Sequence, residues 1–263
     1  MEAGFVSIGT ISMYYREMGR GSPLVYVHGN TASSLWYELV MDVPGYRVFA
    51  PDMPNFGRSS PLLEEITIAH YAESVAGFMD AKGIKDAVIV GHSLGGCVAQ
   101  MLALNRHDLA KALILIDSGS PMGLVTPKDR HPLIELMRTN RAVLEQALRA
   151  VVPGLKDEAF FQKLVDDAQQ MATSAWIGNA EALSHFDISS KCAEYQGRVL
   201  VIRGSLDALI TDEMAKQTTE AFPNASLVTL EDIGHSVIVE DPMLFLKLLR
   251  EFLAEEREPL WQK

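Results

Sequence analysis

The sequence predicts an α/β fold in which a mostly parallel central sheet is flanked by helices and carries an inserted helical cap. Three observations predict it. Short apolar runs bounded by turn residues alternate with longer segments of helical period, which is typical of βαβ units. The apolar runs are nearly continuous, which indicates strands covered on both faces. The alternation breaks once, over residues 120–197, where helical segments occur without a convincing strand.

Apolar runs predict the strands in chain order. Residues 6–15 alternate apolar and polar side chains around Gly9 and Thr10, which predicts a hairpin leading into the sheet. The parallel strands are expected at residues 24–27, 48–50, 87–90, 113–116, 199–202 and 227–230.

Capping signals predict where the helices begin and end. Thr67 is expected to cap a helix over residues 67–82, because Gly83 falls just past its end. Pro242 suits the first position of a last helix that starts at Asp241 and runs to about residue 255. The other helices are expected at residues 94–105, 133–137, 141–151 and 158–171.

The segment 120–197 is too long to be an ordinary connection. A crossover between parallel strands needs only about a dozen residues, so we expect this insertion to form a helical cap. The core would then comprise residues 1–119 and 198–263. Open α/β sheets bind ligands at the carboxyl ends of their strands, and the cap is expected at that edge.

Composition limits the class of protein. A chain of 263 residues with 48% hydrophobic residues can bury a substantial core, which excludes dominant disorder. The net charge of −11 argues against binding to nucleic acid or to anionic membranes. Neither Cys97 nor Cys192 lies in a metal-ligand pattern, and the first residues lack a secretory signal. We expect a cytoplasmic protein with no metal and no cofactor.

A glycine-flanked serine follows the predicted strand 87–90. In the G-x-S-x-G segment from Gly91 to Gly95, Ser93 stands between this strand and the next helix. A serine on such a sharp turn takes strained backbone angles, and small neighbours allow the helix and the strand to approach closely. The helix directs its free N–H groups toward negative charge that forms beside the hydroxyl. This context favours a nucleophile over a glycine-rich packing turn.

A nucleophilic serine needs a base, and the base needs an orienting acid. His235 lies between the last predicted strand and the last helix, so it is the expected base at the same sheet edge as Ser93. Asp207 follows the strand 199–202 and is the expected acid, which gives the chain order serine, acid, histidine. Asp117 also follows a strand and competes for this role, although we interpret it as a hydrogen-bonding loop residue.

Four segments together resemble the α/β-hydrolase superfamily, in particular its capped, carboxylesterase-like serine hydrolases. They are Val27 to Asn30, Asp52 to Ser59, Gly91 to Gly96, and the loops of Asp207 and His235. The resemblance covers nearly the whole chain outside the expected cap, and it implies an oxyanion hole formed by the backbone N–H groups of Asn30 and Leu94. Asn55 stands where the family usually has glycine. Asparagine tolerates positive φ, so we expect the turn to be kept.

Asn30 also stands in a loop similar to that of haloalkane dehalogenases, in which the asparagine side chain helps to hold the halide. Those enzymes use an aspartate nucleophile. With Ser93 in its place, halide displacement would leave an ether on the enzyme, so dehalogenase and epoxide hydrolase activities are disfavoured. The Asn30 side chain either hydrogen-bonds the substrate or braces its loop, and the sequence favours neither. His28 and His92, which adjoin glycines, are interpreted as residues that set loop conformation.

These residues predict a cofactor-free serine hydrolase that cleaves small carboxylic esters through an acyl-enzyme. Its partners would be the ester and water, with neither nucleic acid nor membrane, and the chain would be a monomer or a homodimer. A lactonase, a C–C bond hydrolase, a perhydrolase or an acyltransferase would use the same triad, whereas a hydrolase-like small-molecule receptor would keep the fold without turnover. Substrate contacts are expected from Trp36, Met122, Trp176 and Phe186.

Overall fold

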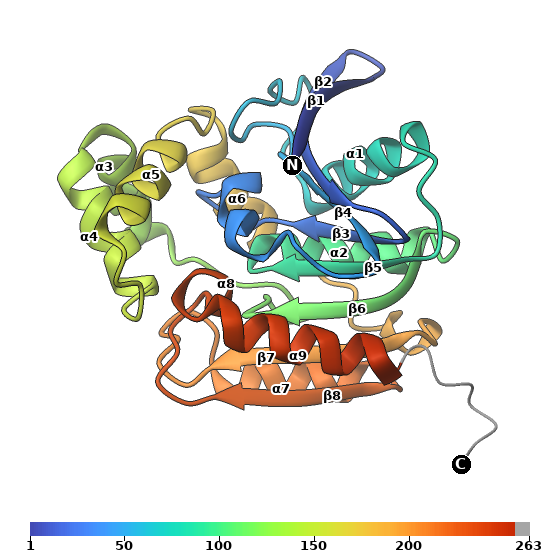
Figure 1. Ribbon diagram of the computed structural model, residues 1–263. Coiled ribbons are helices and arrows are strands. Elements are labelled where there is room, and N and C mark those ends of the chain that lie inside the picture. Colours follow the sequence, from blue (N-terminus) through green and yellow to red (C-terminus); the bar gives the residue numbers. More distant parts are fainter. Residues whose placement is uncertain (256–263) are drawn as a thin grey trace.

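An eight-stranded sheet runs through the structure, a computed structural model that describes residues 1–255 (Figure 1). Along the sheet the strands are β1 (Glu2–Ile8), β2 (Ile11–Gly19), β4 (Tyr46–Pro51), β3 (Ser22–Val27), β5 (Ala87–His92), β6 (Ala110–Ile116), β7 (Arg198–Gly204) and β8 (Ala225–Leu230). The β1–β2 and β2–β4 pairs are antiparallel, and the other neighbouring pairs are parallel. The predicted mostly parallel sheet is confirmed, and each predicted strand lies within an observed one or, for residues 6–15, within the β1–β2 hairpin.

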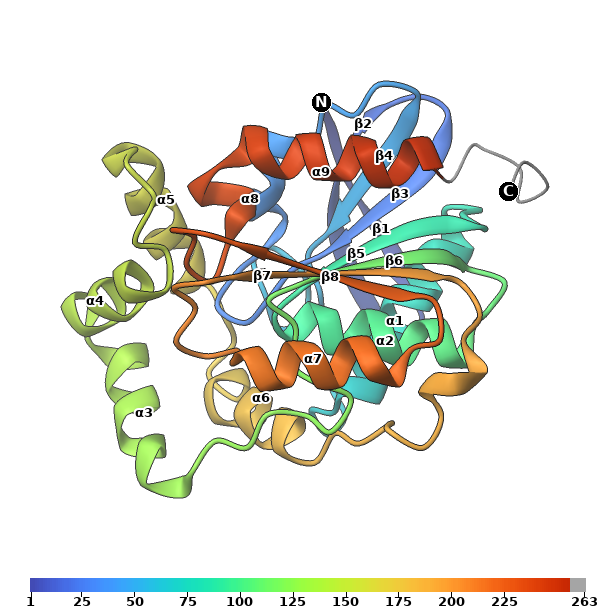
Figure 2. The ribbon, with the colours of Figure 1, turned by 90° about the horizontal axis from the view of Figure 1, so that it is seen from below.

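Helices cover both faces of the sheet. Figure 2 shows α1 (Ile68–Ala81), α2 (Leu94–Asn105) and α7 (Asp212–Ala221) on one face and α9 (Pro242–Glu255) on the other. The Thr67 side chain accepts a hydrogen bond from the His70 N–H at 3.1 Å, and Gly83 follows the helix with φ +66°, so both predicted boundary signals of α1 act as expected. The short helices η1 (Ser34–Val40) and α8 (Val237–Glu240) complete the core.

Residues 120–197 join β6 to β7 through helices. The elements are η2 (Lys128–Arg130), α3 (His131–Thr139), α4 (Arg141–Val151), α5 (Glu158–Ala168), α6 (Ala175–Ser184) and η3 (Cys192–Glu194). In Figure 1 α3, α4 and α5 lie beyond the ends toward which the parallel strands point. The helix predicted over residues 158–171 is too long by one turn. The chain leaves α5 after Ala168, where the Gln170 N–H bonds to the Asp167 carbonyl in a tighter turn.

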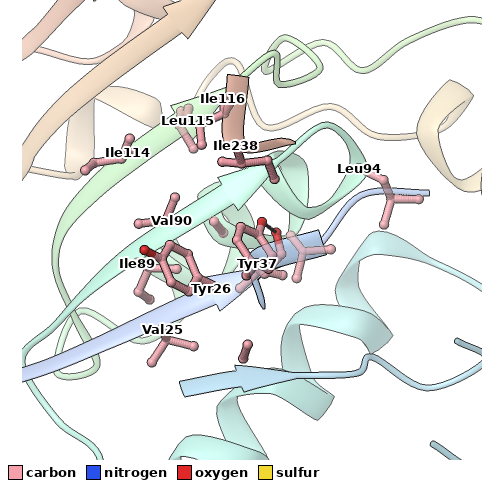
Figure 3. Close-up of a cluster of buried hydrophobic side chains, with 14 of the residues drawn as sticks. Val25, Tyr26, Tyr37, Ile89, Val90, Leu94, Ile114, Leu115, Ile116 and Ile238 are labelled. Atoms are coloured by element: carbon pink, nitrogen blue, oxygen red, sulfur yellow. Dashed lines mark hydrogen bonds between the residues drawn. The ribbon is translucent and has the colours of Figure 1, made fainter. Parts of the chain in front are cut away.

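The core lies between the strands β3, β5 and β6 and the helices that pack on them. Val25, Ile89 and Ile114 are fully buried in these three strands (Figure 3). The rings of Tyr26 and Tyr37 stack with centroids 4.3 Å apart, and each hydroxyl donates to a backbone carbonyl at 2.9 Å. These buried strands hold the loops at their carboxyl ends in fixed positions.

Within residues 1–255, we find no helix with both the length and the apolar character that a membrane crossing requires.

Candidate active site

Ser93 lies on the turn between β5 and α2. Its backbone angles, φ 54° and ψ −120°, fall in a region that non-glycine residues rarely adopt, at a cost of about 1–3 kcal/mol. The Ser93 N–H donates to the Ile116 carbonyl at 2.9 Å, which ties the turn to β6. Among the residues described, the Ser93 side chain has no hydrogen-bond partner and is partly exposed. The strained turn therefore presents an accessible hydroxyl.

Two glycines let the neighbouring backbone approach this turn. A Cβ at Gly95 would lie 2.2 Å from the Val27 carbonyl oxygen and 2.3 Å from that of His28, so a side chain there would push α2 away from the end of β3. A Cβ at Gly29 would lie 3.0 Å from the Ser93 Cβ. The loop after β3 is therefore in direct contact with the serine.

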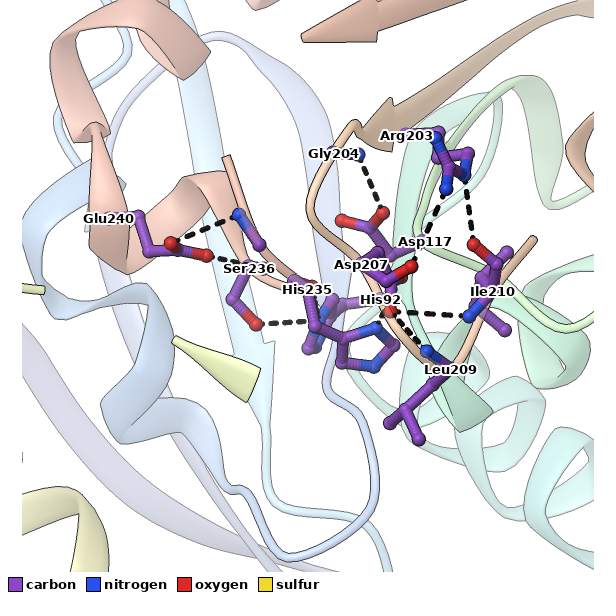
Figure 4. A network of polar contacts seen from close by, with 11 residues as sticks. His92, Asp117, Arg203, Gly204, Asp207, Leu209, Ile210, His235, Ser236 and Glu240 are labelled. Atoms are coloured by element: carbon purple, nitrogen blue, oxygen red, sulfur yellow. Dashed lines mark hydrogen bonds and ion pairs between the residues drawn. The ribbon is translucent and has the colours of Figure 1, made fainter. Parts of the chain in front are cut away.

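The loops after β7 and β8 bring Asp207 and His235 together. Asp207 Oδ2 accepts a hydrogen bond from His235 Nδ1 at 2.7 Å (Figure 4). Asp207 Oδ1 accepts from the N–H groups of Leu209 and Ile210 at 2.7 and 3.2 Å. Burial opposes ionisation, but the hydrogen bond and charge of His235 and the two backbone donors outweigh it, so the pKa of Asp207 lies below its ordinary value. Asp207 is thus an ionised acceptor that fixes the ring of His235.

His92 lies between the serine and the histidine loop. Its Nε2 is 2.8 Å from the His235 carbonyl oxygen and 2.9 Å from Ser236 Oγ. A carbonyl can only accept, so Nε2 carries the proton. Burial, followed by the charge of His235, lowers the pKa of His92 to about 3, so its ring is neutral. Trp36 stacks on His92 with ring centroids 5.9 Å apart. The sequence interpretation of His92 as a loop-setting residue agrees with these contacts.

Glu240 ties the histidine loop to the helices inserted between β6 and β7. Its Oε2 accepts from the Gly234 N–H at 3.1 Å and from the Gly154 N–H at 2.8 Å. The His235 N–H donates to the Val151 carbonyl at 2.8 Å. The end of α4 and the loop after it are therefore fastened to the residues on either side of the imidazole.

Asp117 lies beside this pair and does not bond to His235 in the structure. Its Oδ1 accepts from the Gly204 N–H at 2.9 Å, whereas its buried Oδ2 has no hydrogen-bond partner. Burial, followed by the charge of Asp207, raises the pKa of Asp117 well above its ordinary value. The raised pKa favours the protonated form of Asp117, and its bond to Gly204 braces the start of the Asp207 loop, as expected for a hydrogen-bonding loop residue.

His28 fixes the peptide that connects Gly29 to Asn30. The Met53 N–H donates to His28 Nε2 at 2.9 Å, so the other nitrogen, Nδ1, carries the proton and donates to the Gly29 carbonyl at 2.9 Å. The N–H of a trans peptide points opposite to its carbonyl, so the Asn30 N–H is directed away from His28. The N–H of Leu94, as the first residue of α2, has no partner within the helix.

The turn at Asn55 is kept. Its φ of 75° lies in the left-handed region, which confirms the expectation that asparagine keeps the turn.

Asp117, Asp207 and His235 also form a group of possible metal ligands whose ligand atoms lie within 4.8 Å of one another. His235 Nδ1 and Asp207 Oδ2 are bonded to each other, so a metal ion held by these atoms would have to replace that hydrogen bond.

The four predicted substrate-contact residues differ in how far they are exposed. Trp36 and Trp176 are buried, whereas Met122 is 51% exposed. Phe186 is buried and lines a cavity of about 780 Å³ between α6, the start of α1 and Met101 of α2. Their contact with substrate stays a prediction.

Sequence reasoning missed Glu240 and Asn179. Glu240 ends a short, buried apolar run, which is an unusual place for a carboxylate. Asn179 is a fully buried amide within the otherwise small and apolar helix α6. A polar residue inside an apolar run was the available signal in both cases, because buried polar groups require partners.

Family models match most of the chain. Residues 22–157 match a model described as alpha/beta hydrolase fold, and residues 168–260 match one described as TAP-like protein. The two models together reach from β3 to the last helix.

The chain is similar to several known proteins. It is 30% identical to a protein named putative carbamate hydrolase RutD of Pseudomonas syringae, over 83% of this chain and 88% of that protein. It is 25% identical to a pimeloyl-[acyl-carrier protein] methyl ester esterase of Yersinia pseudotuberculosis, over 94% and 99%. Its structure resembles that of an esterase from Exiguobacterium antarcticum with a TM-score of 0.87 and 20% identity, over 95% and 98%. The chain therefore belongs to the α/β-hydrolase family, and it is a hydrolase.

Proposed function

We propose that this chain is a carboxylesterase that cleaves small carboxylic esters through a Ser93–His235–Asp207 triad. The observation that carries the proposal is the 2.7 Å hydrogen bond from His235 to an ionised Asp207. Ser93 stands on a strained turn next to His92, whose Nε2 contacts the His235 carbonyl oxygen at 2.8 Å. Relatives named as a methyl ester esterase and a carbamate hydrolase also support a carbonyl substrate.

In the first half-reaction, Ser93 Oγ attacks the ester carbonyl carbon while His235 Nε2 takes the hydroxyl proton. Asp207 holds the imidazole in the tautomer that leaves Nε2 free to accept, and it stabilises the imidazolium that results. The carbonyl oxygen becomes an oxyanion, which accepts hydrogen bonds from the N–H groups of Asn30 and Leu94. The tetrahedral intermediate then collapses, and His235 returns the proton to the departing alkoxide.

The second half-reaction repeats these steps with water. His235 Nε2 removes a proton from a water molecule, whose oxygen attacks the carbonyl carbon of the acyl-enzyme. Collapse breaks the bond to Ser93 Oγ, His235 protonates that oxygen, and the carboxylic acid leaves. No electron transfer occurs, so the protein's own groups are sufficient.

Residues 120–197 serve as a cap in this proposal. The Val151 carbonyl accepts from the His235 N–H, and the Gly154 N–H donates to Glu240, which supports a cap over the reacting groups. Cys97 and Cys192 are buried free thiols, which supports a reducing, cytoplasmic location.

Hydrolysis of short p-nitrophenyl esters by wild type and Ser93→Ala tests the proposal. We expect Ser93→Ala to lose at least about 10³-fold in kcat, because the nucleophile is absent. Ser7→Ala, which removes an exposed hydroxyl from β1, is the control and keeps the wild-type rate. Equal rates for wild type and Ser93→Ala refute the triad, and a folded wild type without turnover favours the receptor alternative.

A further inference from the structure

A chain of buried side-chain hydrogen bonds connects the loop of Asn30 with helices on both sides of it. Asn179 Nδ2 donates to Asn30 Oδ1 at 2.8 Å, and the Tyr71 hydroxyl donates to Asn179 Oδ1 at 2.8 Å. Asn55 Nδ2 donates to the Tyr71 hydroxyl at 2.9 Å. Asn55, Tyr71 and Asn179 are each at most 2% exposed, so water does not compete for these bonds. We refer to these three residues as the amide relay.

One backbone group fixes the direction of every bond in the amide relay. The Leu62 N–H can only donate, and it bonds to an oxygen of Asn55 at 3.0 Å. The amide nitrogen of Asn55 therefore faces Tyr71. The Tyr71 hydroxyl accepts this bond and directs its own proton to the oxygen of Asn179. Burial raises the pKa of Tyr71, so that proton stays in place.

The last member of the relay then fixes Asn30. The nitrogen of Asn179 faces Asn30 and also contacts Met171 Sδ at 3.6 Å, which again requires a donor at that position. Asn30 must meet this donor with its oxygen. Its own nitrogen, Nδ2, is left without a protein partner among residues 1–255, and Asn30 is partly exposed. The relay thus turns an amide that could flip into one that presents only N–H donors.

The Asn30 side chain extends toward α6 from the loop that contacts the serine. Gly29, the neighbour of Asn30, contacts Ser93, whereas the Asn30 side chain reaches toward Asn179 on α6. The backbone N–H of Asn30 is assigned to the proposed oxyanion hole, so its side-chain Nδ2 is a second donor of the same residue, for another oxygen of the substrate.

We propose that Asn30 Nδ2 is a substrate-binding donor, held by the amide relay, that selects esters with a second oxygen acceptor beside the scissile carbonyl. This inference rests on the proposed esterase function and deepens it. The substrate class is an ester with an ether or carbonyl oxygen within a few bonds of the reacting carbon, on its acyl or its alcohol side. Asn30 would touch the substrate, whereas Asn179, Tyr71 and Asn55 are positioning residues.

Matched ester pairs that differ only by an oxygen in place of a methylene test this inference. The acyl pair is p-nitrophenyl methoxyacetate and p-nitrophenyl butyrate, and the alcohol pair is 2-methoxyethyl acetate and butyl acetate. For each enzyme the ratio of kcat/KM within a pair is measured. Dividing the wild-type ratio by the variant ratio cancels the intrinsic reactivity of the esters.

Two variants interrupt the proposed contact, and a third is the control. Asn30→Ala removes the donor, and Tyr71→Phe removes the hydroxyl that fixes the relay. Tyr26→Phe makes the same substitution at another buried tyrosine, whose hydroxyl bonds to the Val40 carbonyl outside the relay. Circular dichroism and thermal melting confirm that each variant is folded.

In at least one pair, we expect the kcat/KM ratio of the oxygen-containing ester to its methylene analogue to be about fivefold to tenfold higher for wild type than for Asn30→Ala and Tyr71→Phe. A factor of this size corresponds to one hydrogen bond. Tyr26→Phe keeps the wild-type ratio. The inference is overturned if the two variants keep the wild-type ratios in both pairs, or if they lose activity equally on both members of each pair. In either case, hydrolysis that depends on Ser93 leaves the esterase proposal standing. Absence of any Ser93-dependent hydrolysis overturns both.

Discussion

At the residue scale, the pKa values of two neighbouring carboxyl groups are shifted in opposite directions. Asp207 receives donors from His235 and from two backbone N–H groups, which keeps it ionised. Asp117 receives one donor, from Gly204, and burial and the charge of Asp207 raise its pKa. Two ionised carboxylates close together in a buried site repel each other, which favours the protonated form of one of them. The additional hydrogen-bond donors therefore make Asp207, and not Asp117, the carboxylate that orients His235.

Substitution by asparagine separates the two roles. Asp207→Asn removes the acceptor that selects the His235 tautomer, so we expect kcat for ester hydrolysis to fall by about 10³-fold or more. Asp117→Asn keeps an oxygen for the Gly204 N–H and replaces a carboxyl whose raised pKa favours the neutral form, so we expect kcat to stay within about threefold of wild type. Steady-state kinetics on one p-nitrophenyl ester measures both. A larger loss for Asp117→Asn than for Asp207→Asn would contradict the assignment of the acid.

The sequence predicts Ser93, Asp207 and His235 because each follows a recognisable strand at one sheet edge. It leaves Asn30 open between two roles. The orientation of the Asn30 side-chain amide is set by its hydrogen bond to Asn179, which is distant in the chain. The residues next to Asn30 in the sequence carry no information about such a distant partner.

At the element scale, a buried carboxyl on α5 meets the loop that leads into η1. Asp167 Oδ1 accepts from the Ser33 hydroxyl at 2.7 Å, and its buried Oδ2 has no hydrogen-bond partner. Burial, only partly offset by the Ser33 hydrogen bond, raises the pKa of Asp167 to about 7. Burial therefore favours the protonated form of Asp167 in the folded chain more than the Ser33 hydrogen bond favours the carboxylate.

Asp167 makes stability depend on pH. Its pKa is higher in the folded than in the unfolded chain, so its contribution is full below the ordinary value of 3.8 and is lost as pH rises through about 7. The rise of about three pKa units sets an upper limit of about 4 kcal/mol. We expect Asp167→Asn to keep the Ser33 bond and to raise the free energy of unfolding by about 1–3 kcal/mol at pH 8, with little change at pH 4.

Urea unfolding of wild type and Asp167→Asn at both pH values measures this effect. Asp166→Asn is the matched control, because the neighbouring Asp166 is exposed on the same helix and pairs with Arg141. A stabilisation by Asp167→Asn that is equal at pH 4 and pH 8 would show that Asp167 does not titrate in this range.

Elements with strong apolar patterns were predictable and those without were not. Residues 94–105 coincide with α2, which is buried on most sides and is therefore largely apolar. The sequence does not single out α7 (Asp212–Ala221), because this helix buries only Ala215 and Thr218 and is otherwise polar. Helix α6 also escapes prediction, since small residues and Asn179 interrupt its apolar period.

The net charge of −11 acts at the scale of the whole molecule. A negative field repels anions as they approach, and it favours departure of the carboxylate product. Added salt screens exposed charges, with a Debye length of about 10 Å at 0.1 M and about 30 Å at 0.01 M.

Salt dependence of esterase activity tests the influence of this field. We expect kcat/KM for an anionic ester, p-nitrophenyl hemisuccinate, to rise severalfold between about 0.01 M and 0.5 M sodium chloride as repulsion is screened. The neutral p-nitrophenyl valerate is the control, and its kcat/KM should change little. Equal efficiency for the two esters at low salt would mean that the acidic surface does not act on substrates.

Covalent labelling with a fluorophosphonate, followed by mass-spectrometric mapping of the modified peptide, tests most directly the proposal that the Ser93–His235–Asp207 triad carries the reaction. A serine activated by His235 attacks the reagent far faster than an ordinary hydroxyl does. We predict one adduct per chain, on Ser93, in wild type, and none in folded His235→Ala over the same time. Labelling of a residue other than Ser93, or equal labelling of Ser93 in His235→Ala, would contradict the account.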